Sequence, residues 1–203
     1  MALDVGAATH TGRVREMNED VYRLEPGLGL FLVCDGMGGA PAGEVASAIA
    51  ADAVVSHLSS MAAPGASPHA SANGSGYLPR TSRLAEAVHQ SNAAIYAQAQ
   101  LDTRRLGMGT TLVGAWIDQN IVSLAHVGDS RAYLWHEGAL QPLTRDHSLV
   151  EAQIEAGIID REQGLLSEQQ NVLVRALGIE EQVEVDLAEV PVQPGDCVLL
   201  CSD

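Results

Sequence analysis

Basic side chains, cysteines and long apolar runs are all scarce in this chain of 203 residues. Lys and Arg together number 11 against 26 Asp and Glu, which gives a formal net charge of -15. Nucleic acids and anionic membranes reward clustered Lys and Arg, so the charge argues against both as partners. A basic phosphopeptide or a divalent cation fits better, although most of the carboxylates are expected only to keep the protein soluble.

The use of cysteine and the lack of a membrane-length apolar run favour a soluble, cytoplasmic protein. Cys34, Cys197 and Cys201 have no paired spacing typical of zinc, and they lie in apolar segments, which predicts reduced thiols that pack in the core. No apolar stretch is long enough to span a bilayer, and the N-terminus lacks the basic and apolar regions of a signal peptide.

The length of the chain suits a single domain over residues 1–203. With 46% hydrophobic residues, the chain can bury one core and is short for two. The stretch of about 61–81 consists mainly of Ala, Gly, Ser and Pro, which predicts a mobile surface insertion without a function of its own.

Local patterns predict antiparallel sheets covered by helices. Strands are expected over 3–8, 21–24, 28–34, 183–187 and 197–201, with a strand-rich block over 110–143. Apolar periodicity predicts helices over 43–60, 82–101, 149–156 and 160–169, the third of them capped by Asp146 or Ser148. Two helices followed by several strands with tight turns do not make the alternating pattern of a parallel sheet, so the predicted fold class is α+β.

The most informative motif is Asp35-Gly36-Met37-Gly38-Gly39, which follows an apolar strand. Glycines let backbone carbonyls turn toward a ligand at little steric cost. Asp35 through its carboxylate and Gly36 through its carbonyl are therefore candidate ligands of a hard metal ion. For a single Asp-Gly pair, a plain hairpin corner is the alternative.

Three further segments place acidic groups at strand ends or turns. They are Arg15 to Asp20, the turn that contains Asp129, and Asp203 after the last apolar strand. Four such segments predict an all-oxygen site of the kind that Mg²⁺ or Mn²⁺ prefers. Taken singly, each acid would be an ordinary turn residue, and Asp129 could simply stabilise its own turn.

Seven motifs in register resemble the bacterial type 2C, metal-dependent Ser/Thr protein phosphatases, the PPM family. The motifs are Arg-x-x-Asn-Glu-Asp, Asp-Gly-Met-Gly-Gly, Gly-Thr-Thr, Val-Gly-Asp-Ser-Arg-Ala-Tyr, Thr-Arg-Asp-His-Ser, Asn-Val-Leu-x-Arg-Ala-Leu-Gly and a terminal Ser-Asp. The resemblance implies a four-layer α-β-β-α sandwich of two antiparallel sheets flanked by helices, with a two-metal centre in a cleft at one edge.

The resemblance also implies ligands for two ions, or three. Asp35 would bridge both metals, the Gly36 carbonyl would bind one of them, and Asp203 would bind the other. Asp20 would belong to the metal site and, with Glu19 beside it, would hold coordinated waters. Asp129 matches the carboxylate that helps to bind a third, weaker metal.

The resemblance assigns substrate binding to Arg15, as the arginine that grips the phosphate. A guanidinium pairs with phosphate oxygens and does not lose its proton, which suits positioning rather than acid catalysis. His147 begins a flap of about 147–177 and is a candidate for a supporting role beside the metals. No histidine stands out as general acid, because Met37 and Ala40 occupy the positions where relatives carry one.

The activity implied by the resemblance is hydrolysis of phosphoserine and phosphothreonine in proteins, in opposition to Ser/Thr kinases. Two bridged cations of Mn²⁺ or Mg²⁺ would neutralise the phosphate and activate a water, without a covalent intermediate. Relatives continue beyond the position of Asp203 and carry a further aspartate ligand there, so a C-terminally truncated site with an unpaired edge strand is expected. The alternatives are a catalytically impaired phosphoprotein-binding domain and a purely structural scaffold.

Overall fold

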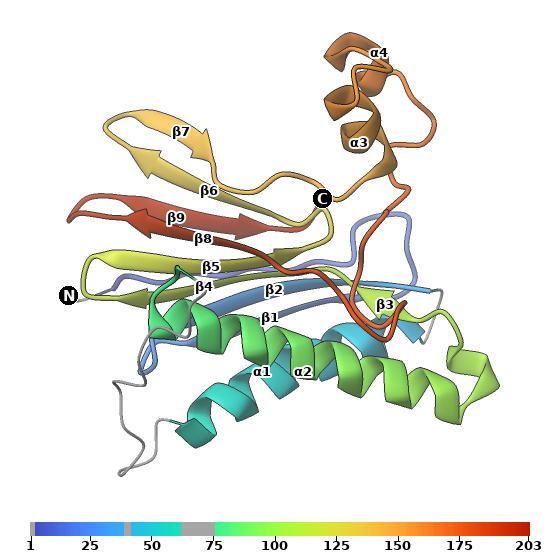
Figure 1. The fold of residues 1–203 in the computed structure, drawn as a ribbon, viewed down its shortest axis with the longest axis horizontal. Helices are drawn as coiled ribbons and strands as arrows, with labels where there is room; N and C mark the ends of the chain where they lie inside the picture. Colours follow the sequence, from blue (N-terminus) through green and yellow to red (C-terminus); the bar gives the residue numbers. More distant parts are fainter. Residues whose placement is uncertain (1–2, 39–41, 62–75) are drawn as a thin grey trace.

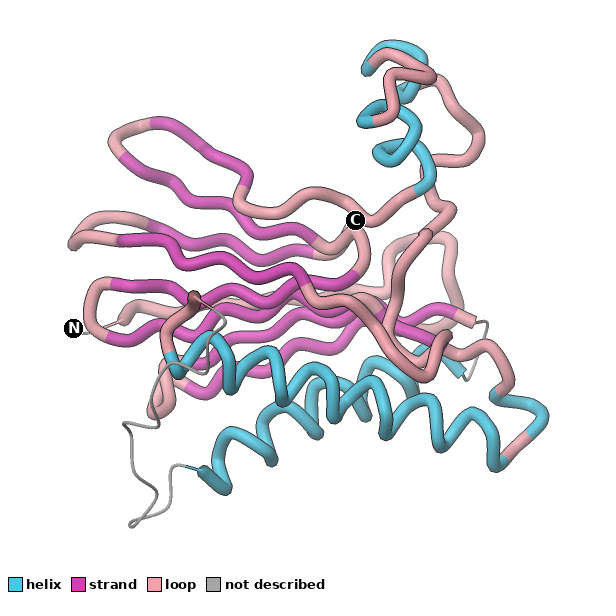
Figure 2. The backbone as a smooth tube through the Cα atoms, viewed as in Figure 1, coloured by secondary structure: helices cyan, strands magenta, loops and turns pink. Residues whose placement is uncertain are grey.

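Two stacked antiparallel sheets form the body of the protein, and two long helices cover one of them (Figures 1 and 2). The structure is a computed structural model that describes residues 3–38, 42–61 and 76–203. The predicted α+β sandwich of antiparallel sheets flanked by helices is confirmed. Within the described residues, no helix is long and apolar enough to cross a bilayer.

The larger sheet contains six strands in antiparallel pairing. Its order is β1 (Asp20–Glu25), β2 (Leu30–Met37), β4 (Leu112–Asp118), β5 (Ile121–Val127) and β8 (Asp186–Pro191), with the short β3 (Gly109–Thr110) on the end of β2. The smaller sheet has the order β7 (Ala139–Pro142), β6 (Arg131–His136) and β9 (Cys197–Cys201).

Helices α1 (Ala42–Met61) and α2 (Pro79–Leu101) pack against each other on the outer face of the larger sheet. A short 3-10 helix, η1 (Thr103–Arg105), follows α2. Helices α3 (Leu149–Glu155) and α4 (Arg161–Leu165) stand beyond the end of the sheets in Figure 1. Ser148 caps α3, which decides between the two predicted caps, and Asp160 closes a capping box on α4.

The protein has two apolar cores, one between the helices and the larger sheet and one between the two sheets. Leu32 and Cys34 of β2 pack toward α1 and α2, whereas Val33 between them packs toward the smaller sheet. Because side chains alternate along a strand, Asp35 extends from the same face of β2 as Val33. The predicted metal ligand therefore lies at the end of the space between the two sheets.

Several predicted boundaries are wrong. Residues 3–8 form no strand, because no described strand pairs with them. They line a cavity of about 890 Å³ beside β1 and β9. Strand β2 continues to Met37, so Asp35 and Gly36 lie within the strand instead of after it. The last two strands were predicted unequally well, since β8 begins at Asp186 rather than at 183, while β9 was predicted correctly.

Helix boundaries also differ from the prediction. Helix α2 begins at Pro79, inside the segment predicted as an insertion, because proline is compatible with the first helical turn. The rest of that prediction, over 62–75, lies outside the described residues, as does Ala40. Helix α4 ends at Leu165, four residues earlier than predicted.

Candidate metal centre

Asp20 and Asp35 face each other across the first two strands. They are register partners in the antiparallel pair of β1 and β2. The hydroxyl of Ser202 donates to Asp20 Oδ2 at 3.0 Å. The carboxyl of the next residue, Asp203, lies close enough to that of Asp35 to raise the pKa of Asp35. Three of the predicted carboxylates, from both ends of the chain, thus meet at one site.

Asp129 joins this group from the turn after β5. Burial raises the pKa of Asp129, and the charges of Asp203 and Asp146 add to the effect. Burial likewise raises the pKa of Asp35 from 3.8 to about 8, followed by the charge of Asp20 and the contact with Asp203. Carboxylates that repel one another in this way fit a divalent cation, which would relieve the repulsion.

The donor chemistry of the aspartate group (Asp20, Asp35, Asp129 and Asp203) also fits a hard ion, because its side chains offer only oxygen. Within the described residues, no three ligand atoms of this group all lie within 4.8 Å of one another. Mg²⁺ is usually held by one or two carboxylates and keeps several waters, which accords with such spacing.

Gly36 is buried where β2 meets the start of α1. Its N–H donates to the backbone oxygen of Glu19 at 3.1 Å, and a Cβ on Gly36 would collide with the backbone of Gly43. The carboxylate of Glu19 packs against Gly43, and its Oε1 is buried without a hydrogen-bond partner in the described part of the protein. An unpaired buried acceptor suits a water molecule at the centre.

Two threonines hold the backbone of Asp35. Thr111 Oγ1 accepts a hydrogen bond from the Asp35 N–H at 2.9 Å and lies 2.6 Å from Ser130 Oγ. Thr110 Oγ1 donates to the Asp35 carbonyl at 2.9 Å. In the sequence both are good strand residues whose hydroxyls could support the site, with packing as the favoured role, and the structure shows the supporting contacts. The Gly-Thr-Thr motif was the available signal.

Arg131 and Arg15 have different surroundings. Arg131 makes a paired contact with Asp146 at 2.8 and 2.6 Å, which is a structural ion pair. Arg15 is exposed in the loop before β1, and no hydrogen bond or ion pair to another described residue holds it. Its substrate-binding role therefore stays a prediction.

His147 contacts the turn that carries Asp129. The ring Nδ1 of His147 accepts a hydrogen bond from the Gly128 N–H at 3.1 Å, and the backbone N–H of His147 donates to the Gly128 carbonyl at 2.8 Å. Gly128 has a φ of 107°, and a Cβ there would also meet Thr111, so the turn needs glycine. His147 thus holds the turn next to Asp129, and its supporting role beside the metals stays a prediction.

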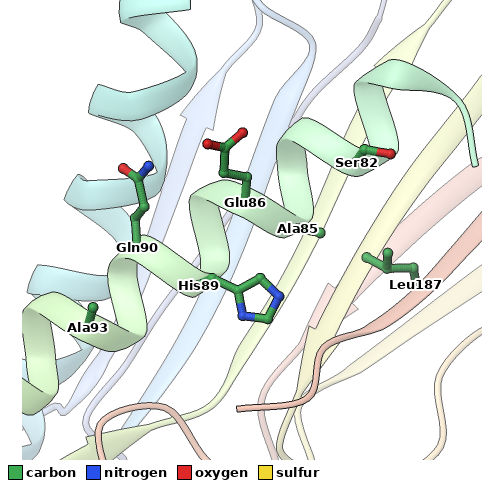
Figure 3. A pocket seen from close by; sticks show the side chains of 7 residues that line it. All are labelled: Ser82, Ala85, Glu86, His89, Gln90, Ala93 and Leu187. Atoms are coloured by element: carbon green, nitrogen blue, oxygen red, sulfur yellow. The ribbon is translucent and has the colours of Figure 1, made fainter. Parts of the chain in front are cut away.

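An open depression between α2 and β8 contains none of the predicted site residues (Figure 3). It measures about 420 Å³ and is lined by α2 residues, among them His89 and Gln90, and by Leu187. We assign it no function.

Two stacked antiparallel sheets with a group of carboxylates at one edge define the class of the protein, a two-sheet sandwich with a candidate metal centre. The chain belongs to the protein phosphatase 2C family, whose model matches residues 10–203.

Similar proteins include bacterial Ser/Thr phosphatases. The chain is 39% identical to the serine/threonine phosphatase stp of Listeria monocytogenes, over 96% of this chain and 75% of that protein. It is 37% identical to the serine/threonine protein phosphatase PstP of Mycobacterium tuberculosis, over 100% of this chain and 36% of that protein.

Solved structures share the fold. A crystal structure of the M. tuberculosis PstP matches with a TM-score of 0.76 and 34% identity, over 94% of this chain and 74% of that one. A structure of the PstP catalytic domain in complex with two manganese ions matches with a TM-score of 0.74 and 34% identity, over 95% of this chain and 74% of that one.

Proposed function

We propose that this chain is a metal-dependent phosphatase that hydrolyses phosphoserine and phosphothreonine in proteins. The convergence of Asp20, Asp35, Asp129 and Asp203 carries the proposal. Relatives at 37–39% identity are named Ser/Thr phosphatases, so the impaired binding domain is not favoured. The proposed reaction would reverse phosphorylation by Ser/Thr kinases. A cytoplasmic location is also proposed, and three free cysteines support it.

Each ligand has a place in the proposed centre. Asp35, Asp203 and the Gly36 carbonyl would hold two ions, with Asp35 as the shared ligand. Asp20 would complete the centre, Glu19 Oε1 would accept a hydrogen bond from a coordinated water, and Asp129 would help to hold a third ion. When bound, such ions neutralise phosphate charge and lower the pKa of water.

Both sheets contribute to this centre, which supports one catalytic domain over the chain. Asp20 and Asp35 come from the larger sheet, and Asp203 follows β9 of the smaller one. Arg15, exposed beside β1, is assigned to the substrate phosphate, which it would orient by paired hydrogen bonds. The segment of 147–177, which contains α3 and α4, is the proposed flap.

The test measures phosphate release from a phosphothreonine peptide in Mn²⁺ or in Mg²⁺. We expect Asp35→Asn to lower kcat by at least ~100-fold, because it removes the charge that the ions require. We expect Arg15→Ala to lower kcat/KM by roughly 10- to 100-fold, the range for a lost charge-assisted hydrogen bond. Arg13→Ala is the matched control, since Arg13 is exposed in the same loop.

Chelation decides the metal dependence. EDTA should abolish activity, and added Mn²⁺ or Mg²⁺ should restore it. Activity that survives EDTA, or that Asp35→Asn leaves intact, would contradict the proposal.

A further inference from the structure

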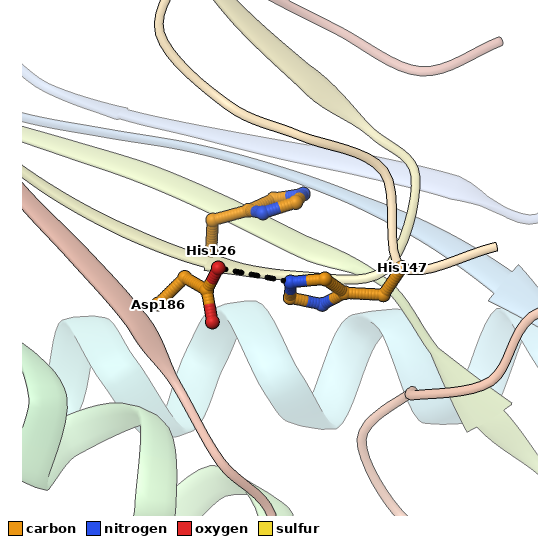
Figure 4. Close-up of side chains that lie close together, drawn as sticks. All are labelled: His126, His147 and Asp186. Carbon is orange, nitrogen blue, oxygen red and sulfur yellow. Dashed lines mark ion pairs between the residues drawn. The ribbon is translucent and has the colours of Figure 1, made fainter. Parts of the chain in front are cut away.

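A second group of possible ligands lies away from the aspartates, in the space between the sheets (Figure 4). His126 of β5 and Asp186 of β8 are register partners, so their side chains extend from the same face of the larger sheet. His147 reaches them from the loop between β7 and α3. Its ring centroid lies 4.6 Å from that of His126, and its Nε2 lies 3.2 Å from Asp186 Oδ2.

The spacing of this group suits a single ion. One ligand atom from each of His126, His147 and Asp186 lies within 4.8 Å of the other two. No other group of three or more His, Cys, Asp or Glu side chains in the described part of the chain meets this distance. The group is therefore tighter than the aspartate group.

His126 supplies the independent sign of a missing ligand. Its side chain is only 2% exposed, and neither ring nitrogen has a hydrogen-bond partner within the described residues. The backbone of Ser130 lies near the ring but does not reach hydrogen-bonding geometry. Buried polar groups are nearly always paired, so two idle nitrogens on one buried ring call for an explanation. In the neutral ring one nitrogen carries a proton and the other a lone pair, and a metal ion would use that lone pair.

An ion can reach the group from solvent. His126 and Asp186 line a cavity of about 810 Å³ between the sheets, and the Asp186 side chain is 51% exposed. A metal site needs such an entry path as well as ligands.

Arg175 is the competing cation. Its Nη1 lies 2.6 Å from Asp186 Oδ1 and 3.1 Å from His147 Nε2, and its Nη2 contacts Glu184 at 3.0 Å. Glu184 and Asp186 together carry one more negative charge than Arg175 balances. A bound ion would displace Nη1, while Glu184 could keep the other end of the guanidinium.

We propose that His126, His147 and Asp186 bind one transition-metal ion of borderline softness, with Zn²⁺ as the expected occupant. Two imidazoles and one carboxylate are a frequent ligand set for zinc and related ions, and they differ in kind from the all-oxygen aspartate group. Three protein ligands leave a further coordination position open toward the cavity.

Occupancy of this site would act on the aspartate group through His147. Because Nδ1 accepts the Gly128 N–H, Nε2 carries the ring proton and donates it to Asp186. An ion on Nε2 moves that proton to Nδ1, and Gly128 then loses its acceptor. The turn that holds Asp129 loosens, so the ion should inhibit a phosphatase reaction at the aspartates.

The binding test uses the whole chain with Asp35→Asn, which disables the aspartate group. Calorimetry with Zn²⁺ and visible absorption of Co²⁺ report the number of ions bound. We expect one ion per chain, and at least tenfold weaker binding when His126→Gln or Asp186→Asn is added. His89→Gln is the matched control, because His89 is exposed on α2. Arg175→Gln should tighten binding, since it removes the competing charge.

The outcomes separate clearly. Absence of bound Zn²⁺ in the Asp35→Asn chain overturns the inference, as does unchanged affinity in both His126→Gln and Asp186→Asn. Thermal unfolding without metal checks that each variant folds. If His126→Gln does not fold, the affinity of the Asp186→Asn variant for Zn²⁺ decides the test. In the otherwise native chain at saturating Mn²⁺, Zn²⁺ should inhibit less after His126→Gln. Equal inhibition of the otherwise native chain and the His126→Gln variant would place the inhibitory Zn²⁺ at the aspartates. It would overturn the proposed effect of the second site on the aspartate group.

Discussion

The neighbours of Asp35 hold its backbone in place but disfavour the charged form of its carboxyl group. Thr110 and Thr111 fix its backbone, while burial and the adjacent aspartates raise the pKa of its carboxyl to about 8. In the unfolded chain the same group would titrate near 3.8. The folded protein therefore resists ionisation at the residue where the proposed reaction needs a negative charge.

The first prediction follows from this shift. The pKa of Asp35 is higher in the folded than in the unfolded protein, so ionisation of Asp35 destabilises the folded state. This destabilisation is absent below about pH 4 and grows until the pH passes about 8. Asp35→Asn should therefore stabilise the metal-free protein at pH 8, by about 1 to 3 kcal/mol after allowance for solvent screening, and by little at pH 4. Urea unfolding in EDTA at the two pH values measures the difference.

The control for this prediction is Asp4→Asn, since Asp4 is an exposed acid. It should leave the free energy of unfolding unchanged at both pH values. Destabilisation by Asp35→Asn at pH 8 would show that the carboxylate makes a favourable contact in the folded state.

Motifs marked single residues in the sequence as candidate ligands. Asp20, Asp35, Asp129 and Asp203 stand in such motifs and lie near one another in the structure, while their role as metal ligands stays a prediction. No motif marks His126, and a histidine on an apolar strand gives no local sign of what faces it. Only the pairing of β5 with β8 places Asp186 opposite that histidine.

At the scale of elements, the contact between β2 and α1 determines the shape of the site. Gly36 and Gly43 touch through their backbones, and the Glu19 carboxylate fills the remaining space. A Cβ on Gly43 would lie 2.8 Å from the Glu19 carboxylate. Glycine is therefore needed here by close approach of a strand, a helix and an acid.

The second prediction tests this contact. Gly43→Ala should lower the free energy of unfolding by about 1 to 3 kcal/mol, the usual cost of overpacking. It should also lower phosphatase activity, because Glu19 and Gly36 must move. Gly27→Ala is the control, since a Cβ there meets nothing within 4 Å. Urea unfolding and phosphate release measure both effects, and equal behaviour of the two variants would refute the argument.

Elements were predicted well where their local pattern was reinforced by packing. Strand β9 was predicted correctly because its alternate residues pack between the sheets. Residues 3–8 have a comparable local pattern but no ladder partner. Strand formation depends on a neighbour, and a single sequence does not say which segments acquire one.

For the whole molecule, the outer face of the smaller sheet leaves apolar side chains open to solvent. Trp135 of β6 is 47% exposed, Leu140 of β7 is 53% exposed, and Leu199 of β9 is 48% exposed. Strand β9 is also the edge of its sheet among the described strands. Unpaired edges and exposed apolar patches both promote association between chains.

The third prediction is that this chain self-associates through the face that contains Leu199. Leu199→Lys should reduce association at high protein concentration, because a charge on the edge strand opposes both pairing and apolar contact. Sedimentation velocity across a concentration series measures the effect. Leu101→Lys is the control, since Leu101 is exposed at the end of α2. If both lysine variants associate as the parent does, another surface is responsible. If both dissolve the assemblies equally, net charge rather than this face controls them.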